Sequence, residues 1–140
     1  MDRCPCCNAR LRETEICPRC KADLSVIINA GQSAQFWLSK AIYYYLESKI
    51  EKSIAALNFS LSLTKTGLAE VFRDFVIQQQ CRGILDLLAK KQVLAAQQQL
   101  YRVRELFPHS EQLKKLNDFT DYLWLNNQQQ SNSSNGLKNG

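Results

Sequence analysis

The sequence predicts a mainly α-helical protein with a small metal-binding module at its N-terminus. Five of the six cysteines fall within the first 20 residues of the 140-residue chain. From Ser33 to about Asn126, apolar residues recur at spacings of three and four, which is the period of a buried helix face. Hydrophobic residues make up 45 % of the chain and charged residues 22 %, as in folded proteins of about one domain. This composition excludes a collagen-like or wholly disordered chain.

The N-terminal module, residues 1–23, contains two Cys-x-x-Cys pairs, Cys4 with Cys7 and Cys17 with Cys20. Each pair makes a tight turn that places two sulfurs on one metal ion, and two such turns complete a tetrahedron. Zinc favours four thiolates in this geometry, and a closed set of ligands leaves no position for a substrate. The segment is too short to bury a useful apolar core, so folding is expected to depend on the metal. The pattern therefore predicts one structural Zn²⁺ per chain.

The other two cysteines are expected to play different parts. Cys6 lies between two ligands, and the spacing of the motif favours Cys4 with Cys7, so Cys6 is expected to be a free thiol. Cys81 lies in helical sequence and is expected to be a small buried apolar residue. A rubredoxin-like iron site shares the four-thiolate chemistry and is the redox alternative, although the spacer is short for that fold.

Residues 4–24 resemble the short zinc-ribbon knuckle family, whose members read Cys-Pro-x-Cys twice with a short spacer between. The family commonly has glycine after the second cysteine of each pair, where Asn8 and Lys21 stand here. Asparagine tolerates the left-handed backbone conformation reasonably and lysine less well. The resemblance implies a zinc ion held by Cys4, Cys7, Cys17 and Cys20.

The rest of the chain divides at helix-ending signals. Residues 24–32 are predicted to form a connector, with a break at Gly31 and a helix N-cap at Ser33. Residues 127–140, rich in Asn, Gln, Ser and Gly, are predicted to be a disordered tail. Between them the periodicity predicts a helical-repeat domain over 33–126, with helices at about 33–48, 51–64, 68–90, 93–107 and 110–125.

Residues 34–126 resemble tetratricopeptide repeats, which are arrays of helical hairpins. In the hairpin over 33–65, the family's bulky, small and aromatic positions correspond to Trp37, Ala41 and Tyr44, and its small–large–small positions to Ser53, Leu57 and Ser60. A degenerate copy over 68–108 ends at a proline, has about nine extra residues and replaces the bulky aromatic by Gln80. Its small–large–small positions are Ala96, Leu100 and Val103, and the helix over 110–126 would cap the array.

The resemblance implies a concave groove that binds a peptide or a helix of another protein. The family's basic carboxylate clamp for chaperone tails has no counterpart here, so that ligand class is not expected. A generic helical bundle with the same core residues is the alternative architecture. The family's pattern places the following partner-binding residues in the groove: Gln35, Leu38, Ile42, Tyr45, Gln78, Arg82 and Leu85.

The sequence gives no sign of catalysis. The only histidine, His109, follows Pro108 in a turn and has no apparent acid–base partner, and no phosphate-binding loop occurs. We therefore expect a protein that is not an enzyme, namely a zinc-binding adaptor that serves as an assembly or regulatory accessory protein. No apolar run could span a membrane or act as a signal peptide, so a cytoplasmic location without membrane binding is expected.

A nucleic-acid-associated factor is the alternative function. The net charge is +5, but basic and acidic residues alternate along the chain, whereas a nucleic-acid footprint is usually a dense basic stripe. The residues that would contact phosphate are the basic side chains of the N-terminal module, Arg3, Arg10, Arg12, Arg19 and Lys21.

Overall fold

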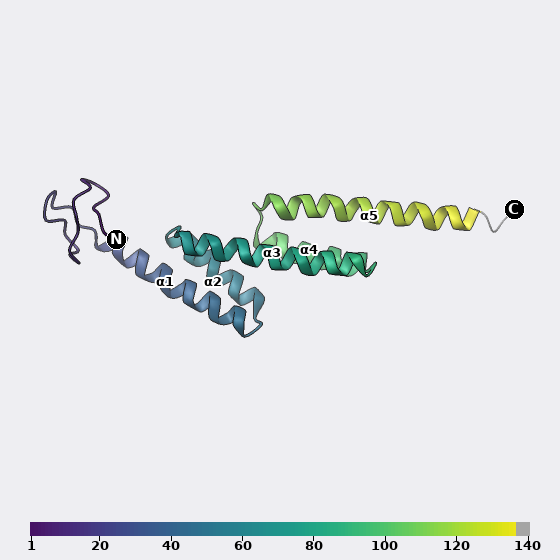
Figure 1. Ribbon diagram of the computed structural model, residues 1–140, viewed down its shortest axis with the longest axis horizontal. Coiled ribbons are helices and arrows are strands. Elements are labelled where there is room, and N and C mark those ends of the chain that lie inside the picture. The colour runs from purple at the N-terminus through teal and green to yellow at the C-terminus, as the bar shows by residue number, and fades with distance from the viewer. Residues whose placement is uncertain (137–140) are drawn as a thin grey trace. The chain divides into compact units, whose positions relative to one another are not determined.

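The computed structural model describes residues 1–136 of the chain. They form an N-terminal segment built of turns, followed by five helices (Figure 1): α1 (Ser25–Leu46), α2 (Ile50–Leu63), α3 (Gly67–Ala89), α4 (Val93–Leu106) and α5 (Glu111–Gly136). These residues contain no β-sheet, and their extended contacts are isolated bridges such as Arg3 with Arg10 and Ile16 with Asp23. The predicted class, mainly α with a four-cysteine cluster at the N-terminus, is confirmed.

The chain divides into two compact units, Met1–Phe72 and Arg73–Gly140. The first contains the cysteine-rich segment, α1, α2 and the first residues of α3. The second contains the remainder of α3 together with α4 and α5.

In the first unit, α1 and α2 form a hairpin in which small residues let the two backbones approach closely. The Ser53 hydroxyl of α2 donates a hydrogen bond to the Ala41 carbonyl of α1 at 2.6 Å. Two turns along, the Ser60 hydroxyl donates to the Ala34 carbonyl at 2.7 Å. Leu57 lies between these two serines and is completely buried. Thus the small–large–small spacing in the sequence corresponds to direct contact between the helices.

The turn that joins α1 to α2 recurs between α3 and α4, 43 residues further along the chain. Ser48 and Lys91 both take the left-handed conformation, with φ of 61° and 60°. The amide of Lys49 donates to the Tyr44 carbonyl, and the amide of Gln92 donates to the Leu87 carbonyl in the same way. The buried positions also match at this offset: Ala34 with Ile77, Leu38 with Cys81, Ala41 with Ile84, Ser53 with Ala96, Leu57 with Leu100, and Ser60 with Val103.

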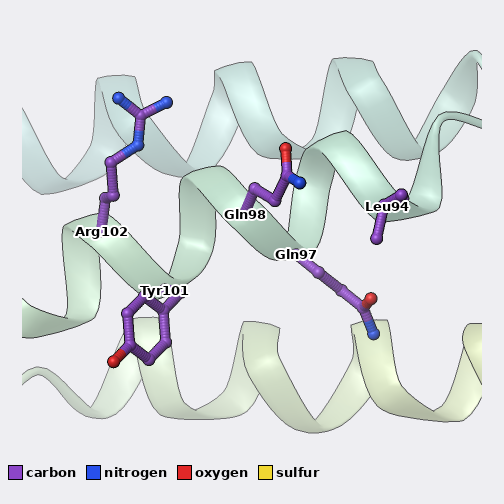
Figure 2. A pocket seen from close by; sticks show the side chains of 5 residues that line it. All are labelled: Leu94, Gln97, Gln98, Tyr101 and Arg102. Atoms are coloured by element: carbon purple, nitrogen blue, oxygen red, sulfur yellow. The ribbon is translucent and has the colours of Figure 1, made fainter.

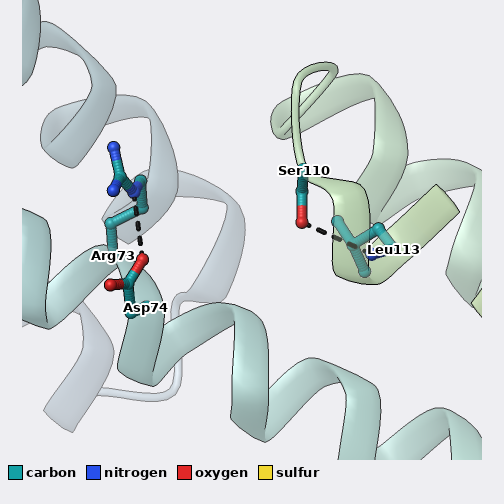
Figure 3. A network of polar contacts seen from close by, with 4 residues as sticks. All are labelled: Arg73, Asp74, Ser110 and Leu113. Atoms are coloured by element: carbon teal, nitrogen blue, oxygen red, sulfur yellow. Dashed lines mark hydrogen bonds and ion pairs between the residues drawn. The ribbon is translucent and has the colours of Figure 1, made fainter. Parts of the chain in front are cut away.

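In the second unit, α5 packs on α4. The Leu113 amide donates to the Ser110 hydroxyl at 3.4 Å, so Ser110 caps the N-terminus of α5 (Figure 3). The same view shows an ion pair between Arg73 and Asp74 on α3. Leu113, Leu116 and Thr120 are buried along one side of α5.

Helix α1 begins earlier than the sequence analysis expects. The predicted connector over 24–32 is helical from Ser25, and Ser33 lies inside the helix rather than at its cap. The Ser25 amide donates to the Asp23 carboxylate at 3.0 Å, and this backbone bond lowers the pKa of Asp23. A carboxylate beside the first free amides stabilises a helix N-terminus, and this signal was overlooked.

Gly31 lies within α1 and does not break it. A Cβ atom added there would meet no atom within 4 Å, and its φ is not positive. We expect Gly31→Ala to raise the free energy of unfolding by about 0.5–1 kcal/mol, because alanine loses less backbone entropy in a helix. Urea denaturation measures this change. A loss of stability would show that the glycine is needed for a bend or a close contact.

Helix α5 continues past the predicted end of the capping helix. Residues 127–136, predicted as part of a disordered tail, are helical, and residues 137–140 lie outside the described part of the chain. No proline interrupts this stretch. The hydroxyl of Ser131 bonds to the Asn127 carbonyl at 3.1 Å, and that of Ser133 bonds to the Gln129 carbonyl at 2.9 Å. The serines thus satisfy their own polar groups within the helix.

Candidate metal centre

The cysteine-rich segment is built from two copies of one turn, 13 residues apart. In the first, the Asn8 amide donates to the Cys4 carbonyl at 2.8 Å. In the second, the Lys21 amide donates to the Cys17 carbonyl at 2.9 Å. The flanking backbone bonds repeat as well. The amides of Cys4 and Cys17 donate to the carbonyls of Ala9 and Ala22, both at 2.9 Å. The Leu11 amide donates to the Asp2 carbonyl at 3.0 Å, and the Leu24 amide donates to the Glu15 carbonyl at 2.7 Å.

This repeat is visible in the sequence, although the sequence analysis missed its full extent. Residues 2–11 and 15–24 both read as acidic-x-Cys-Pro-x-Cys-x-Ala-x-Leu. The alanine carbonyl closes each turn and the leucine follows two residues later. The internal repeat therefore includes residues other than the cysteines. Asn8 and Lys21 both take the left-handed conformation, with φ of 60° and 62°.

The two turns bring together the four cysteines predicted as ligands. Their sulfur atoms lie within 4.8 Å of one another, with Cys4 to Cys20 at 3.7 Å and Cys7 to Cys17 at 3.6 Å. An ion with metal–sulfur bonds of about 2.3 Å has tetrahedron edges of about 3.8 Å. The cysteines are free thiols. The cluster of Cys4, Cys7, Cys17 and Cys20, called the cysteine cluster below, is therefore compatible with one metal ion.

Backbone amides favour the anionic form of the sulfurs on the leading cysteines. The Cys6 amide donates to the Cys4 sulfur at 3.4 Å. Amides of Cys20 and Arg19 lower the pKa of Cys17 to about 6. The Ala22 amide also acts to lower the pKa of Cys20, but burial and the neighbouring sulfurs raise it to about 12. Four sulfurs this close cannot all be anionic without a cation, which is the chemistry a divalent metal satisfies.

A small apolar core surrounds the cysteine cluster and attaches it to α1. Cys4, Cys17 and Leu24 are almost completely buried, and the core is completed by Cys7, Ala9, Leu11, Ala22 and Ile28. Leu24 immediately precedes α1 and Ile28 lies in its first turn. The module and the first helix therefore share one set of apolar contacts within the first unit.

The remaining cysteines lie where the sequence analysis predicts. Cys6 is exposed and lies outside the four-sulfur set. Cys81 is buried in α3, and burial raises the pKa of its thiol.

Lys21 occupies a position that favours glycine. A non-glycine residue in the left-handed region is strained by about 1 kcal/mol or more. We therefore expect Lys21→Gly to stabilise the metal-loaded module by about 0.5–1 kcal/mol, and Lys21→Val to destabilise it by more, because β-branching suits this region poorly. Competition with a chelating dye measures the change in metal affinity. Equal affinities for the three proteins would contradict the assigned turn.

The residues predicted to line a groove are distributed between the two units. Gln35, Leu38, Ile42 and Tyr45 belong to the first, and Gln78, Arg82 and Leu85 to the second. The glutamines, Arg82 and Leu85 are exposed, whereas Ile42 is half-buried and the Tyr45 ring lies edge-to-face against Phe72 at 5.9 Å.

Leu38 does not fit the predicted role. It is only 6 % exposed, because it lies one turn from both Ala34 and Ala41, on the side of α1 that packs against α2. Leu38 is therefore a core residue rather than a surface contact.

The outer side of α4 carries a second set of exposed residues that the sequence analysis did not identify. Figure 2 shows that Leu94, Gln97, Gln98, Tyr101 and Arg102 all arise from this helix and line a shallow pocket. Leu94 and Tyr101 are largely exposed. Their spacing of seven residues, two helical turns, is a signal that the sequence already contains.

No protein-family model, curated protein or solved structure was found to match the chain. Among the described helices, none combines the length and the apolar character that crossing a membrane requires.

Proposed function

We propose that this chain is a non-catalytic, zinc-binding adaptor that binds another protein through its helices. The observation that carries the proposal is the exposure of large apolar side chains on all five described helices. Soluble monomers rarely leave extended apolar patches uncovered, and such patches mark binding surfaces. The exposed residues include Phe36 and Leu46 on α1, Phe59 on α2, Val71 and Phe75 on α3, Leu94 and Tyr101 on α4, and Phe119 and Tyr122 on α5.

Zinc is the metal we propose for the cysteine cluster. The sulfur distances, the paired turns and the left-handed residues after each second cysteine support the resemblance to zinc-ribbon knuckles. Four protein thiolates fill the coordination shell, so the ion would act structurally and hold the two turns together. The thiols and this role suit the reducing cytoplasm, which we propose as the location.

The helical hairpins support the proposed kinship with tetratricopeptide repeats. The small–large–small residues of the two copies are buried at equivalent positions, and both hairpins use the same turn. Within this proposal, the groove contacts are the exposed or half-buried members of the predicted set: Gln35, Ile42, Tyr45, Gln78, Arg82 and Leu85.

Native mass spectrometry of the tagged chain, purified gently from its own host, tests this function. The proposal predicts one zinc ion per chain and a stoichiometric protein partner that Gln35→Ala with Leu85→Ala releases. The control is Gln112→Ala with Lys115→Ala, two exposed polar positions on α5 outside the predicted groove, which should keep the partner. Zinc without any protein partner would contradict the adaptor function.

Nucleic acid is the second candidate partner, because the five basic side chains of the module are all exposed. If they contact duplex phosphates, the logarithm of affinity should fall with the logarithm of salt concentration by about 0.9 per contact. Fluorescence anisotropy with a labelled duplex measures this slope. The absence of binding at low salt would eliminate the candidate.

A further inference from the structure

The hairpin of α1 and α2 carries a pocket lined by Trp37, Tyr44, Lys52, Ala55, Ala56 and Phe59, called the aromatic–lysine pocket below. Its volume is about 310 Å³, at the lower end of the range for small-molecule sites and suited to one or two side chains. The Trp37 ring meets Phe59 edge-to-face at 5.0 Å. Phe59 is 47 % exposed. Aromatic residues of this kind are enriched at protein interfaces.

The charge at this pocket has one sign. Lys52 lines it. The Lys40 ammonium lies over the Phe36 ring at 5.7 Å, and Lys40 is one helical turn from both Trp37 and Tyr44 of the pocket. None of the described residues that line the pocket is acidic. Neither lysine forms an ion pair within residues 1–136. The pocket therefore suits an apolar side chain that is flanked by carboxylates.

The second hairpin shows that the fold does not need these aromatic residues. At the offset of 43 residues, Gln80 stands where Trp37 is, and Gln99 stands where Ala56 is. The Gln99 side chain donates a hydrogen bond to the Gln80 side chain at 3.3 Å. The same hairpin is thus built with an amide pair, so the open aromatic site of the first hairpin is a feature beyond what the fold requires.

Helix α5 offers a surface of complementary chemistry. Asp118, Asp121, Tyr122 and Leu125 follow the spacing of a single helix side and are all exposed; together they are called the acidic face below. Lys114 and Lys115 are exposed one turn before Asp118, so the acidic character begins at Asp118. Asp121 accepts a hydrogen bond from the Asn117 side chain at 3.3 Å, and neither aspartate is in an ion pair among the described residues. An amphipathic helix laid into an apolar groove is a common mode of recognition.

We propose that this chain self-associates by placing the acidic face of one copy over the aromatic–lysine pocket of a second copy. Tyr122 fills the pocket, and Asp118 and Asp121 face Lys40 and Lys52. Each copy carries both surfaces, so two copies can exchange the contact reciprocally and close a dimer. This goes beyond the proposed function, which concerns a different protein.

Charge exchange tests the dimer by sedimentation velocity over a range of protein concentrations. The wild-type chain should dimerise. The variant with Lys40→Glu and Lys52→Glu, and the variant with Asp118→Lys and Asp121→Lys, should each dimerise about ten-fold or more weakly, because like charges then face each other. An equimolar mixture of the two variants should restore the dimer, since every contact in the mixed dimer pairs opposite charges.

A matched control reverses two exposed lysines that line neither surface, Lys65→Glu with Lys90→Glu, and should leave the dimer unchanged. Trp37→Gln, which introduces the residue of the second hairpin, should weaken the dimer while circular dichroism shows the same helix content. The proposal is overturned by a wild-type chain that stays monomeric, by variants that dimerise normally, or by a mixture that fails to restore the dimer. A monomer that instead binds an acidic foreign protein at this pocket would overturn it too. The adaptor function is judged separately, by the co-purified partner.

Discussion

Replacing Cys17 by serine is expected to abolish stoichiometric metal binding and to unfold residues 2–24 while the helices persist. Cys17 is completely buried, and its sulfur lies 3.6 Å from that of Cys7. Structural zinc in small modules contributes about 10–16 kcal/mol of apparent binding free energy, which a segment of this size cannot replace by apolar packing. Elemental analysis measures the metal content, and limited proteolysis at Arg10, Arg12 and Arg19 reports the unfolding.

The matched control is Cys6→Ser, since Cys6 is exposed and its sulfur is outside the cysteine cluster. This variant should keep one metal ion per chain and the protease resistance of the wild-type chain. The assignment of ligands would be wrong if Cys17→Ser kept its metal, or if Cys6→Ser lost it.

Leu57→Ala is expected to lower the free energy of unfolding of the first unit by about 2–5 kcal/mol. Leu57 is completely buried between the two serines that bond α2 to α1, so truncation leaves a cavity that the closely packed backbones cannot fill. Leu100 holds the equivalent position of the second hairpin and is buried to 1 % exposure. Leu100→Ala should therefore destabilise the second unit by a similar amount.

Urea denaturation followed by circular dichroism measures both effects. Leu94→Ala is the control, because this side chain is largely exposed on α4 and its loss should change stability by about 0.5 kcal/mol or less. If Leu57→Ala lowered the free energy of unfolding no more than Leu94→Ala does, the described packing of the first hairpin would be contradicted.

The cysteine cluster could be predicted because two Cys-x-x-Cys pairs specify both the residues and their pairing. Helices α2, α3 and α4 could also be predicted to within a residue at each end, since Gly67 and Pro108 stand at two boundaries and the apolar spacing is regular between them. The start of α1 was predicted too late. Gly31 and Ser33 look like a break and a cap, but the helix begins at Ser25, whose amide donates to the Asp23 carboxylate.

Other features depend on packing that no local pattern contains. Leu38 and Ile42 share the apolar character of groove residues, and only the contact of α1 with α2 buries the first and leaves the second half-exposed. The end of α5 was misjudged because its composition resembles a linker, although the serine hydroxyls bond to carbonyls one turn earlier. The aromatic–lysine pocket combines residues of two helices, so the sequence of either helix alone does not reveal it.

The central claim is that the cysteine cluster holds one structural zinc ion through four sulfurs. X-ray absorption at the zinc edge, on the full-length chain purified without added metal, tests it most directly. The account predicts one zinc per chain with four sulfur neighbours at about 2.3 Å and no nitrogen or oxygen ligand. A spectrum with a nitrogen or oxygen ligand, or a protein that carries iron in place of zinc, would contradict it.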